Sequence, residues 1–275
     1  MLKSLILSAV ALTALSVATE TRAADGTSPV PAGYALDWAE EFNTPGLPDA
    51  KTWVYDTQAN RTGWYNNEKQ YYAAGRLENS EVKDGTLRIT ARKERLSDRA
   101  DYGGQDYSSA RLITRGKVSF LYGFYEIRAK MPCGQGSWPA IWMLGTDAGW
   151  PDGGEIDIME HVGKTPGMTY GTVHNRHTID TRGGPGDGAG IAVPDACTAF
   201  HKYQLLWTPQ KLDFFVDGQH FHTYAKTDQP GAWPFDKPQF LLLNLAIGGN
   251  MAGEVDDGIF PRTFEVDYVR VWKKR

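Results

Sequence analysis

Apolar and polar residues alternate along much of the chain from Tyr34 onward, as they do in half-buried β-strands. In two segments this alternation continues on both sides of an Asp-Gly pair, residues 81–90 around Asp84-Gly85 and residues 213–221 around Asp217-Gly218. Such a pair between alternating segments is a strong hairpin signal, because Asp and Gly tolerate the positive φ of a tight turn. We therefore predict an antiparallel hairpin at each position.

The other strand candidates are apolar or alternating runs bounded by Gly, Pro and polar residues. They cover residues 123–130, 201–207, 239–247 and 263–272, and long amphipathic helical windows are missing from the sequence. Many strands punctuated by Gly and Pro predict an all-β fold, an antiparallel sandwich. Such a sandwich buries one face of each sheet and can curve the other face into a cleft.

The N-terminal segment has the layout of a secretory signal peptide. Lys3 supplies a positive charge, residues 5–18 are almost wholly apolar, and small residues occupy positions 23 and 24. The apolar run is too short to be a permanent membrane anchor, so none is expected. We predict a signal peptide over residues 1–23, cleaved near Ala23, then a linker over residues 24–33 and one domain over residues 34–275. The mature protein is expected to be secreted or periplasmic.

Composition narrows the class of partner. A net charge of −4 gives no broad attraction to phosphate backbones, so nucleic acid is not an expected partner. Aromatic residues make up 12% of the chain and include nine Trp, which predicts either a large sandwich core or a groove lined with flat stacking surfaces. The length of 275 residues suits a single all-β domain, and a monomer is expected.

Cys133 and Cys197 are the two cysteines of the chain. In an oxidising compartment an even pair predicts one disulfide, while two separate buried thiols remain the alternative. Because no His clusters beside them in the sequence, the pair does not predict a structural zinc site.

Three acids, Glu155, Asp157 and Glu160, lie within one run of six residues. A helix would place Glu155 and Asp157 about 200° apart, on opposite faces. A regular strand places these two on one face but turns Glu160 to the other. One β-bulge at residues 158–159 returns Glu160 to the face of the other two, and bulges are common beside active sites. We therefore predict a bulged strand with three acids on one face.

This arrangement predicts carboxyl groups that act on a sugar. Glu155 and Glu160, leaning inward, would bring their carboxyl groups to about 5–6 Å, close to the separation in glycosidases that retain anomeric configuration. Asp157 between them would raise at least one pKa, because like charges this close disfavour ionisation. Two other interpretations are three acids on a solvent-exposed strand and a calcium site, although the run lacks the turn that gathers a calcium-binding loop.

The run Gly154-Glu155-Ile156-Asp157-Ile158-Met159-Glu160-His161 resembles the active-site strand of glycoside hydrolase family 16, in its bulged form with Met. That form is similar to the laminarinases, which are endo-β-1,3-glucanases, and to related agarases and carrageenases. The resemblance extends over residues 37–272 and includes residues 64–72, 122–130, 136–144, 243–249 and 266–271. It implies a β-jelly-roll sandwich of two curved antiparallel sheets with an open substrate cleft.

The resemblance also implies roles for individual residues. Glu155 would be the nucleophile, Glu160 the general acid/base, and Asp157 a hydrogen-bond partner of the nucleophile. The positions that contact substrate in the family correspond to Asn67, Arg111, Trp138, Trp142, Trp150, His174 and Asn244. After His174 the chain departs from many laminarinases, with Asn175-Arg176-His177 in place of an aromatic or small residues. The substrate contacts around that segment are therefore left open.

A structural calcium ion is often present on the convex face in this family. The matching positions are Glu41, Gly85 and Asp267, of which two would offer only main-chain oxygens. The ion would be remote from the chemistry, and no cofactor is expected for catalysis.

Together with the predicted signal peptide, the resemblance implies a secreted, endo-acting glycosidase that cleaves β-1,3-glucan with retention of configuration. The alternatives on the same fold are hydrolysis of mixed-linkage β-glucan, agar or carrageenan, and transglycosylation. A non-catalytic glucan-binding protein is a further alternative, although such relatives have lost the catalytic acids that this chain keeps.

Overall fold

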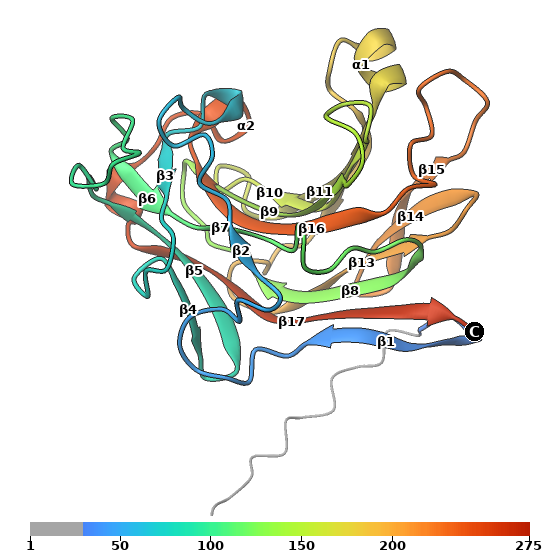
Figure 1. Cartoon of the computed structure of the whole chain (residues 1–275), viewed down its shortest axis with the longest axis horizontal. Helices are drawn as coiled ribbons and strands as arrows, with labels where there is room; N and C mark the ends of the chain where they lie inside the picture. Colours follow the sequence, from blue (N-terminus) through green and yellow to red (C-terminus); the bar gives the residue numbers. More distant parts are fainter. Residues whose placement is uncertain (1–29) are drawn as a thin grey trace, which may run out of the picture.

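Two β-sheets lie face to face in the computed structural model, which describes residues 30–275 (Figure 1). The predicted signal peptide and most of the predicted linker lie outside the described residues. The first strand begins at Tyr34. Within the described residues, none of the helices has the length and apolar character needed to cross a membrane.

The elements run in the order β1 (Tyr34–Glu40), β2 (Val54–Tyr55), η1 (Tyr65–Asn67), β3 (Gln70–Tyr72), β4 (Ser80–Lys83), β5 (Thr86–Lys93), β6 (Tyr107–Ser109), β7 (Arg111–Ile113), β8 (Gly123–Lys130), β9 (Ser137–Gly145), β10 (Glu155–His161), β11 (Met168–His174), α1 (Arg176–Arg182), β12 (Asp187–Ala192), β13 (His201–Trp207), β14 (Lys211–Val216), β15 (Gln219–Ala225), β16 (Gln239–Ile247), α2 (Gly249–Ala252), η2 (Asp257–Ile259) and β17 (Arg262–Lys274).

The larger sheet has ten strands, with β15-β14-β13-β8-β17-β5-β6-β3 in order, β1 paired with β17 and β4 paired with β5. The smaller sheet has seven strands in the order β12-β11-β10-β9-β16-β7-β2. All their pairings are antiparallel except that of β3 with β6. The predicted all-β sandwich is confirmed. Figure 1 shows α1 and α2 rising at opposite ends of the seven-stranded sheet, on the side away from the ten-stranded sheet.

Both predicted hairpins are present. The strands β4 and β5 pair with Lys83 opposite Thr86, and the turn residues Asp84 and Gly85 have φ of 52° and 73°. Between β14 and β15, Asp217 and Gly218 form the same kind of turn, with φ of 49° and 80°. Two consecutive positive φ angles match the right-handed twist of the flanking strands, which explains why Asp-Gly occupies both turns.

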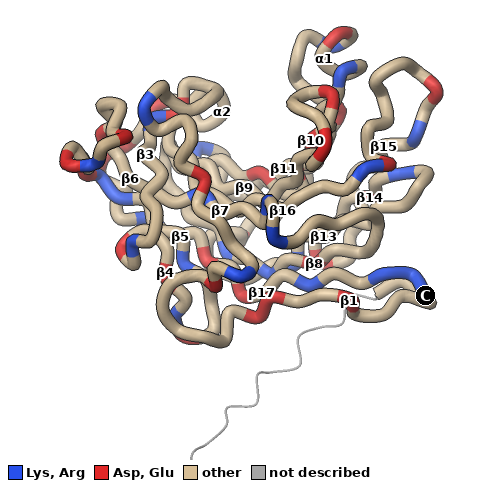
Figure 2. The backbone as a smooth tube through the Cα atoms, viewed as in Figure 1, with Lys and Arg blue, Asp and Glu red and all other residues tan. Residues whose placement is uncertain are grey.

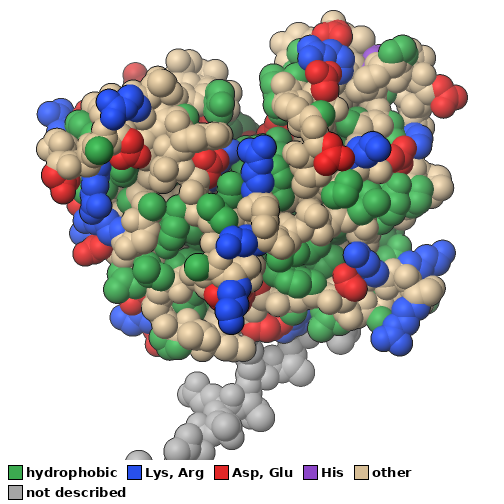
Figure 3. All heavy atoms as spheres, in the orientation of Figure 1, with side chains coloured by type: hydrophobic (Ala, Val, Ile, Leu, Met, Phe, Trp, Pro, Cys, Tyr) green, Lys and Arg blue, Asp and Glu red, His purple; other side chains and the backbone are tan. Residues whose placement is uncertain are grey.

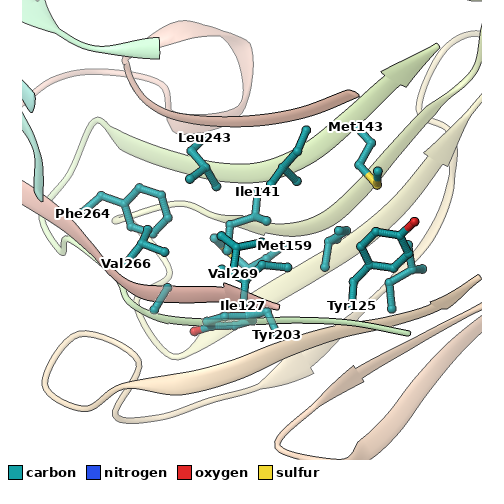
Figure 4. Close-up of a cluster of buried hydrophobic side chains, with 14 of the residues drawn as sticks. Tyr125, Ile127, Ile141, Met143, Met159, Tyr203, Leu243, Phe264, Val266 and Val269 are labelled. Atoms are coloured by element: carbon teal, nitrogen blue, oxygen red, sulfur yellow. The ribbon is translucent and has the colours of Figure 1, made fainter. Parts of the chain in front are cut away.

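The main core fills the space between the sheets (Figure 4). Ile141 and Met159 from the seven-stranded sheet are fully buried, as are Ile127 and Val269 from the ten-stranded sheet. Burying an aliphatic side chain of this size stabilises a fold by about 1.5–3 kcal/mol relative to leaving it exposed. The alternate residues of the inner strands therefore fix which face of the seven-stranded sheet points outward.

Cys133 and Cys197 form a disulfide, with Cα atoms 5.6 Å apart. No His lies beside this pair in the sequence, but one lies beside it in the fold. Folding brings the end of β10 to the two loops, so that Cys133, Cys197 and His161 each place one candidate ligand atom within 4.8 Å of the others. Because both sulfur atoms are in the disulfide, neither is a thiolate ligand.

The residues matched to the calcium site have basic partners. Asp267 Oδ2 accepts a hydrogen bond from Arg128 Nη1 at 2.8 Å. The Glu41 carboxylate receives two hydrogen bonds from Arg270, at 2.7 and 3.0 Å. Asp267, the only side chain expected to bind the ion, therefore already has a guanidinium partner on Oδ2. The calcium ion stays a prediction.

Candidate active site

A cleft of about 1080 Å³ lies on the outer face of the seven-stranded sheet. Figure 3 shows it as the hollow between the two raised rims of the molecule, and Figure 2 shows acidic and basic residues interspersed over the surrounding chain. The floor consists of the residues of β9, β10, β11 and β16 that alternate with core residues, including Trp138, Trp142, Glu155, Asp157, Glu160, Thr172, His174 and Asn244.

The predicted bulge in β10 is confirmed by the register on both sides of the strand. Against β9, Asp157 pairs with Trp142 and Met159 pairs with Ile141, so Ile158 is the extra residue. The register against β11 also shifts after Asp157. Both residues of the bulge are buried in the core, Ile158 being 2% and Met159 0% exposed. The extra residue therefore turns Glu160 to the cleft, where Glu155 and Asp157 also lie.

Each acid of β10 has a partner in the cleft. Trp150 Nε1 donates a hydrogen bond to Glu155 Oε2 at 2.5 Å, and Trp138 Nε1 donates to Glu160 Oε1 at 3.1 Å. Asp157, which is 3% exposed, has Oδ2 3.3 Å from His174 Nε2. The two outer acids thus receive neutral donors, while the central acid faces an imidazole.

Burial is the main cause of the raised pKa values of these acids. It raises the pKa of Glu155 to about 8, with the charge of Asp157 as the second cause. Burial and then the charge of Glu155 raise the pKa of Glu160 to about 7. The pKa of Asp157 is also raised well above its ordinary value, by burial and then by Glu160. The sequence predicted the direction from like charges alone, whereas desolvation contributes more.

These raised pKa values predict that the cluster destabilises the fold in alkaline solution. The folded-state pKa of Glu160, about 7, lies above the ordinary 4.5, so the folded chain holds this proton more tightly than the unfolded chain. The resulting stability is fully present below about pH 4.5 and is lost as pH rises through about 7. Glu160→Gln is therefore expected to raise the free energy of unfolding at pH 9 by up to roughly 3 kcal/mol.

Calorimetric melting at pH 4 and pH 9 measures this effect. Glu160→Gln should raise Tm relative to the unmodified chain at pH 9 but not at pH 4. Glu254→Gln, at an exposed position, is the matched control and should leave Tm unchanged at both values. An equal shift of Tm at pH 4 and pH 9 for Glu160→Gln would contradict the linkage.

Two of the residues predicted to contact substrate, Trp142 and Asn244, are hydrogen-bonded to each other. Trp142 Nε1 donates a hydrogen bond to Asn244 Oδ1 at 2.7 Å, and Asn244 Nδ2 donates to the Tyr72 hydroxyl at 2.9 Å. The Trp142 ring is also 4.7 Å from the guanidinium carbon of Arg111. This network fixes the plane of an aromatic surface on the cleft floor.

Arg111 lies in the cleft wall, but its guanidinium group is already paired with a carboxylate. Its side chain is almost wholly buried, and Nε is 3.0 Å from Asp56 Oδ2. The guanidinium also lies against the ring of Trp64, at 5.1 Å. Arg111 therefore supports Trp142 more directly than it offers a free cation to a ligand.

The other predicted contacts lie at the ends of the cleft. Asn67 donates a hydrogen bond to Asn250 Oδ1 at 2.7 Å, between η1 and α2. Trp150 is 55% exposed and lines the cleft beside Glu155. All seven positions matched to substrate contacts lie in or beside one cleft.

Several residues that line the cleft were not predicted from the sequence. Thr172 and Tyr170 are two and four positions before His174 on β11, so period-2 counting could have placed them on the same face. Glu68 also lines the cleft, and burial raises the pKa of its carboxyl group. The wall made by α1 and the start of β12 was not predicted, because Asn175-Arg176-His177 gave no strand or helix signal long enough to recognise.

Comparisons with known proteins agree with this geometry. The family described as Glycosyl hydrolases family 16 matches residues 67–270. A beta-glucanase of Rhodothermus marinus is 45% identical over 256 residues, which cover 87% of this chain and 85% of that protein. A glucan endo-1,3-beta-glucosidase of Cryptopygus antarcticus is 37% identical over 256 residues, covering 87% and 92%.

Solved structures of similar enzymes also superpose on this chain. SCLam, described as a non-specific endo-beta-1,3(4)-glucanase from family GH16, superposes with a TM-score of 0.84 at 51% identity, over 90% of this chain and 94% of that one. The laminarinase from Rhodothermus marinus superposes with a TM-score of 0.79 at 44% identity, over 87% and 97%. With the family match covering most of its length, the chain belongs to glycosyl hydrolases family 16 and is a glycosidase.

Proposed function

We propose that the chain is an endo-acting β-1,3-glucanase that retains anomeric configuration through a covalent glycosyl-enzyme. The observation that carries the proposal is the bulge of β10, which turns Glu155, Asp157 and Glu160 to one face of a cleft with Trp138 and Trp142. A flat sugar face packs on such rings, while hydroxyl groups are held by polar side chains.

In the proposed reaction, Glu155 attacks the anomeric carbon and Glu160 protonates the leaving oxygen. Water then releases the sugar from Glu155, with Glu160 acting as the base. Asp157 keeps its proton, as its raised pKa favours, and its carboxyl group is a hydrogen-bond partner of Glu155. Because the charge of Asp157 is a cause of the raised pKa of Glu155, a proton on Asp157 leaves Glu155 free to ionise as the nucleophile.

The substrate class follows from the relatives. The relatives from Rhodothermus marinus and Cryptopygus antarcticus are named for β-glucans, and SCLam is described as a non-specific endo-beta-1,3(4)-glucanase. We propose β-1,3-glucan as the main substrate and mixed-linkage β-1,3-1,4-glucan as a second one. Carrageenan is less favoured, because the guanidinium of Arg111 is paired with Asp56 and does not offer a free charge to a sulfated sugar.

We further propose that the enzyme acts outside the cytoplasm. The support is the signal-like segment of residues 1–23 and the Cys133–Cys197 disulfide, which is the form expected in an oxidising compartment.

Product analysis on laminarin, barley β-glucan, agarose and carboxymethylcellulose in parallel tests the substrate. We expect oligosaccharides of mixed length from laminarin, shorter ones from barley β-glucan, and no release from the other two. Proton NMR during the first minutes on laminarin tests the stereochemistry, and the β-anomer should appear first. Cleavage of agarose with none of laminarin would overturn the substrate, and the α-anomer as first product would overturn retention.

A further inference from the structure

One wall of the cleft is a short turn that is held at both ends. Gly184, Pro185 and Gly186, called the lip below, connect α1 to β12, and all three line the cleft. On the β12 side, Arg182 Nη2 donates to Asp187 Oδ2 at 2.7 Å across the turn.

The start of α1 is anchored in buried surroundings. Asn175 caps the helix by accepting a hydrogen bond from the Thr178 amide at 2.9 Å. Its Nδ2 donates to the Tyr224 hydroxyl at 2.8 Å and to the Ala232 carbonyl at 3.0 Å. With both ends fixed, the position of the lip over the cleft is set by the fold.

The lip lies directly on the ring of His174. A Cβ atom added to Gly186 would be 2.7 Å from His174 Cε1, 2.9 Å from its Nδ1 and 2.6 Å from Thr172 Cγ2. Carbon atoms do not approach so closely without displacement, so glycine is required for this contact. The Nδ1 atom is buried beside the lip and has no hydrogen-bond partner within the described chain.

The opposite edge of the same ring faces the catalytic acids. His174 Nε2 is 3.3 Å from Asp157 Oδ2, and His174 pairs with Glu155 in the register of β10 and β11. The ring is thus held between the lip and the carboxyl cluster. We infer that Gly186 is a positioning residue, which presses the His174 imidazole against Asp157 and so sets the charge next to the reacting carboxyl groups.

This inference rests on the proposed roles of the three acids. The charge of His174 lowers the pKa of both Glu155 and Glu160, so a displaced ring raises both. The elements that carry or flank the ring also bear other charged or titratable groups, namely Glu160 and His161 on β10, Tyr170 on β11, Arg176, His177, Asp180 and Arg182 on α1, Asp187 on β12, and His220, His222 and Tyr224 on β15.

The test compares Gly186→Ala with Gly183→Ala in the full chain. Gly183 has a φ of 70°, close to the 76° of Gly186, and a Cβ there meets nothing within 4 Å. Both variants therefore carry the same backbone strain, and only Gly186→Ala displaces His174. We expect Gly186→Ala to lower kcat/KM on laminarin about tenfold or more relative to Gly183→Ala, since small misplacements of catalytic groups have effects of this order.

The pH profile separates positioning from a loss of structure. Both limbs of the kcat/KM profile of Gly186→Ala should move to higher pH by about half a unit to one unit. In a His174→Gln background, adding Gly186→Ala should cause no further shift, because the group through which Gly186 acts is gone. An unshifted profile, or a full effect of Gly186→Ala in the His174→Gln background, would overturn the inference.

A measurement that does not depend on catalytic activity tests this inference separately from the proposed function. If the unmodified chain cleaves none of the glucans, the proposed function fails. Carbon-13 NMR titration of the Glu and Asp carboxyl groups still compares the variants. Higher pKa values for Glu155 and Glu160 in Gly186→Ala than in Gly183→Ala support the inference, and equal values refute it.

Discussion

Glu155→Gly is expected to lower the rate of laminarin hydrolysis by at least about a thousandfold, the order of effect that removal of an enzymatic nucleophile has. The reason is that no other described carboxyl group occupies the end of β10 beside Trp150. Glycine also leaves a space that a small anion can fill. Added azide should restore turnover on an activated β-glucoside, and the product should be the α-glucosyl azide, because azide then attacks from the face that Glu155 occupied.

Glu160→Ala should give the opposite product. With Glu155 in place the glycosyl-enzyme still forms from an activated substrate, and azide attacks it from the other face to give the β-glucosyl azide. Hydrolysis of laminarin, whose leaving group needs a proton, should fall about 10²–10⁴-fold. Glu81→Ala on β4, in the ten-stranded sheet, is the control and should retain activity. If Glu155→Gly yields the β-azide, the two roles are assigned the wrong way round.

Deletion of Met159 should lower activity severely by removing the bulge. Without it, β10 keeps the register of Glu155 and Asp157 but turns Glu160 by one position, toward the core side of the strand. We expect a loss of about 10²–10⁴-fold, the contribution of a general acid. The deletion also removes a fully buried side chain, so stability falls as well.

Met159→Ala separates these two effects. It keeps the bulge and the direction of Glu160 while leaving a cavity, which costs about 2–5 kcal/mol of stability. Its activity below its own Tm should stay near that of the unmodified chain. Circular dichroism checks that both variants are folded. A folded deletion variant with near-normal kcat would show that β10 can shift its register, and the assignment of faces by counting would then be wrong.

The parts of the fold that follow from local chemistry could be predicted from the sequence. Asp84-Gly85 and Asp217-Gly218 identified two hairpins, because few other residue pairs adopt two positive φ angles. Counting along β10 gave the bulge, because Ile158 and Met159 are apolar while the flanking acids are not. Both results depend on residues close together in the chain.

The parts that depend on contacts between distant segments could not be predicted. The pairing of Arg111 with Asp56 and its position between two indole rings require β7 to meet β9 and the segment that follows β2. His161 lies near the disulfide only because the end of β10 meets the loops that carry Cys133 and Cys197. The short helix α1 has seven residues, too few for a periodic pattern, and its cap at Asn175 relies on partners about 50 residues away.

The indole donors of the two outer acids give the cleft a spectroscopic property. Trp138 donates to Glu160 and Trp150 donates to Glu155, so each catalytic carboxyl group has an ultraviolet chromophore as its hydrogen-bond partner. The emission of an indole depends on the charge next to its N–H group. Ionisation of each acid, and its capture by a sugar, is therefore coupled to fluorescence from a tryptophan that already belongs to the site.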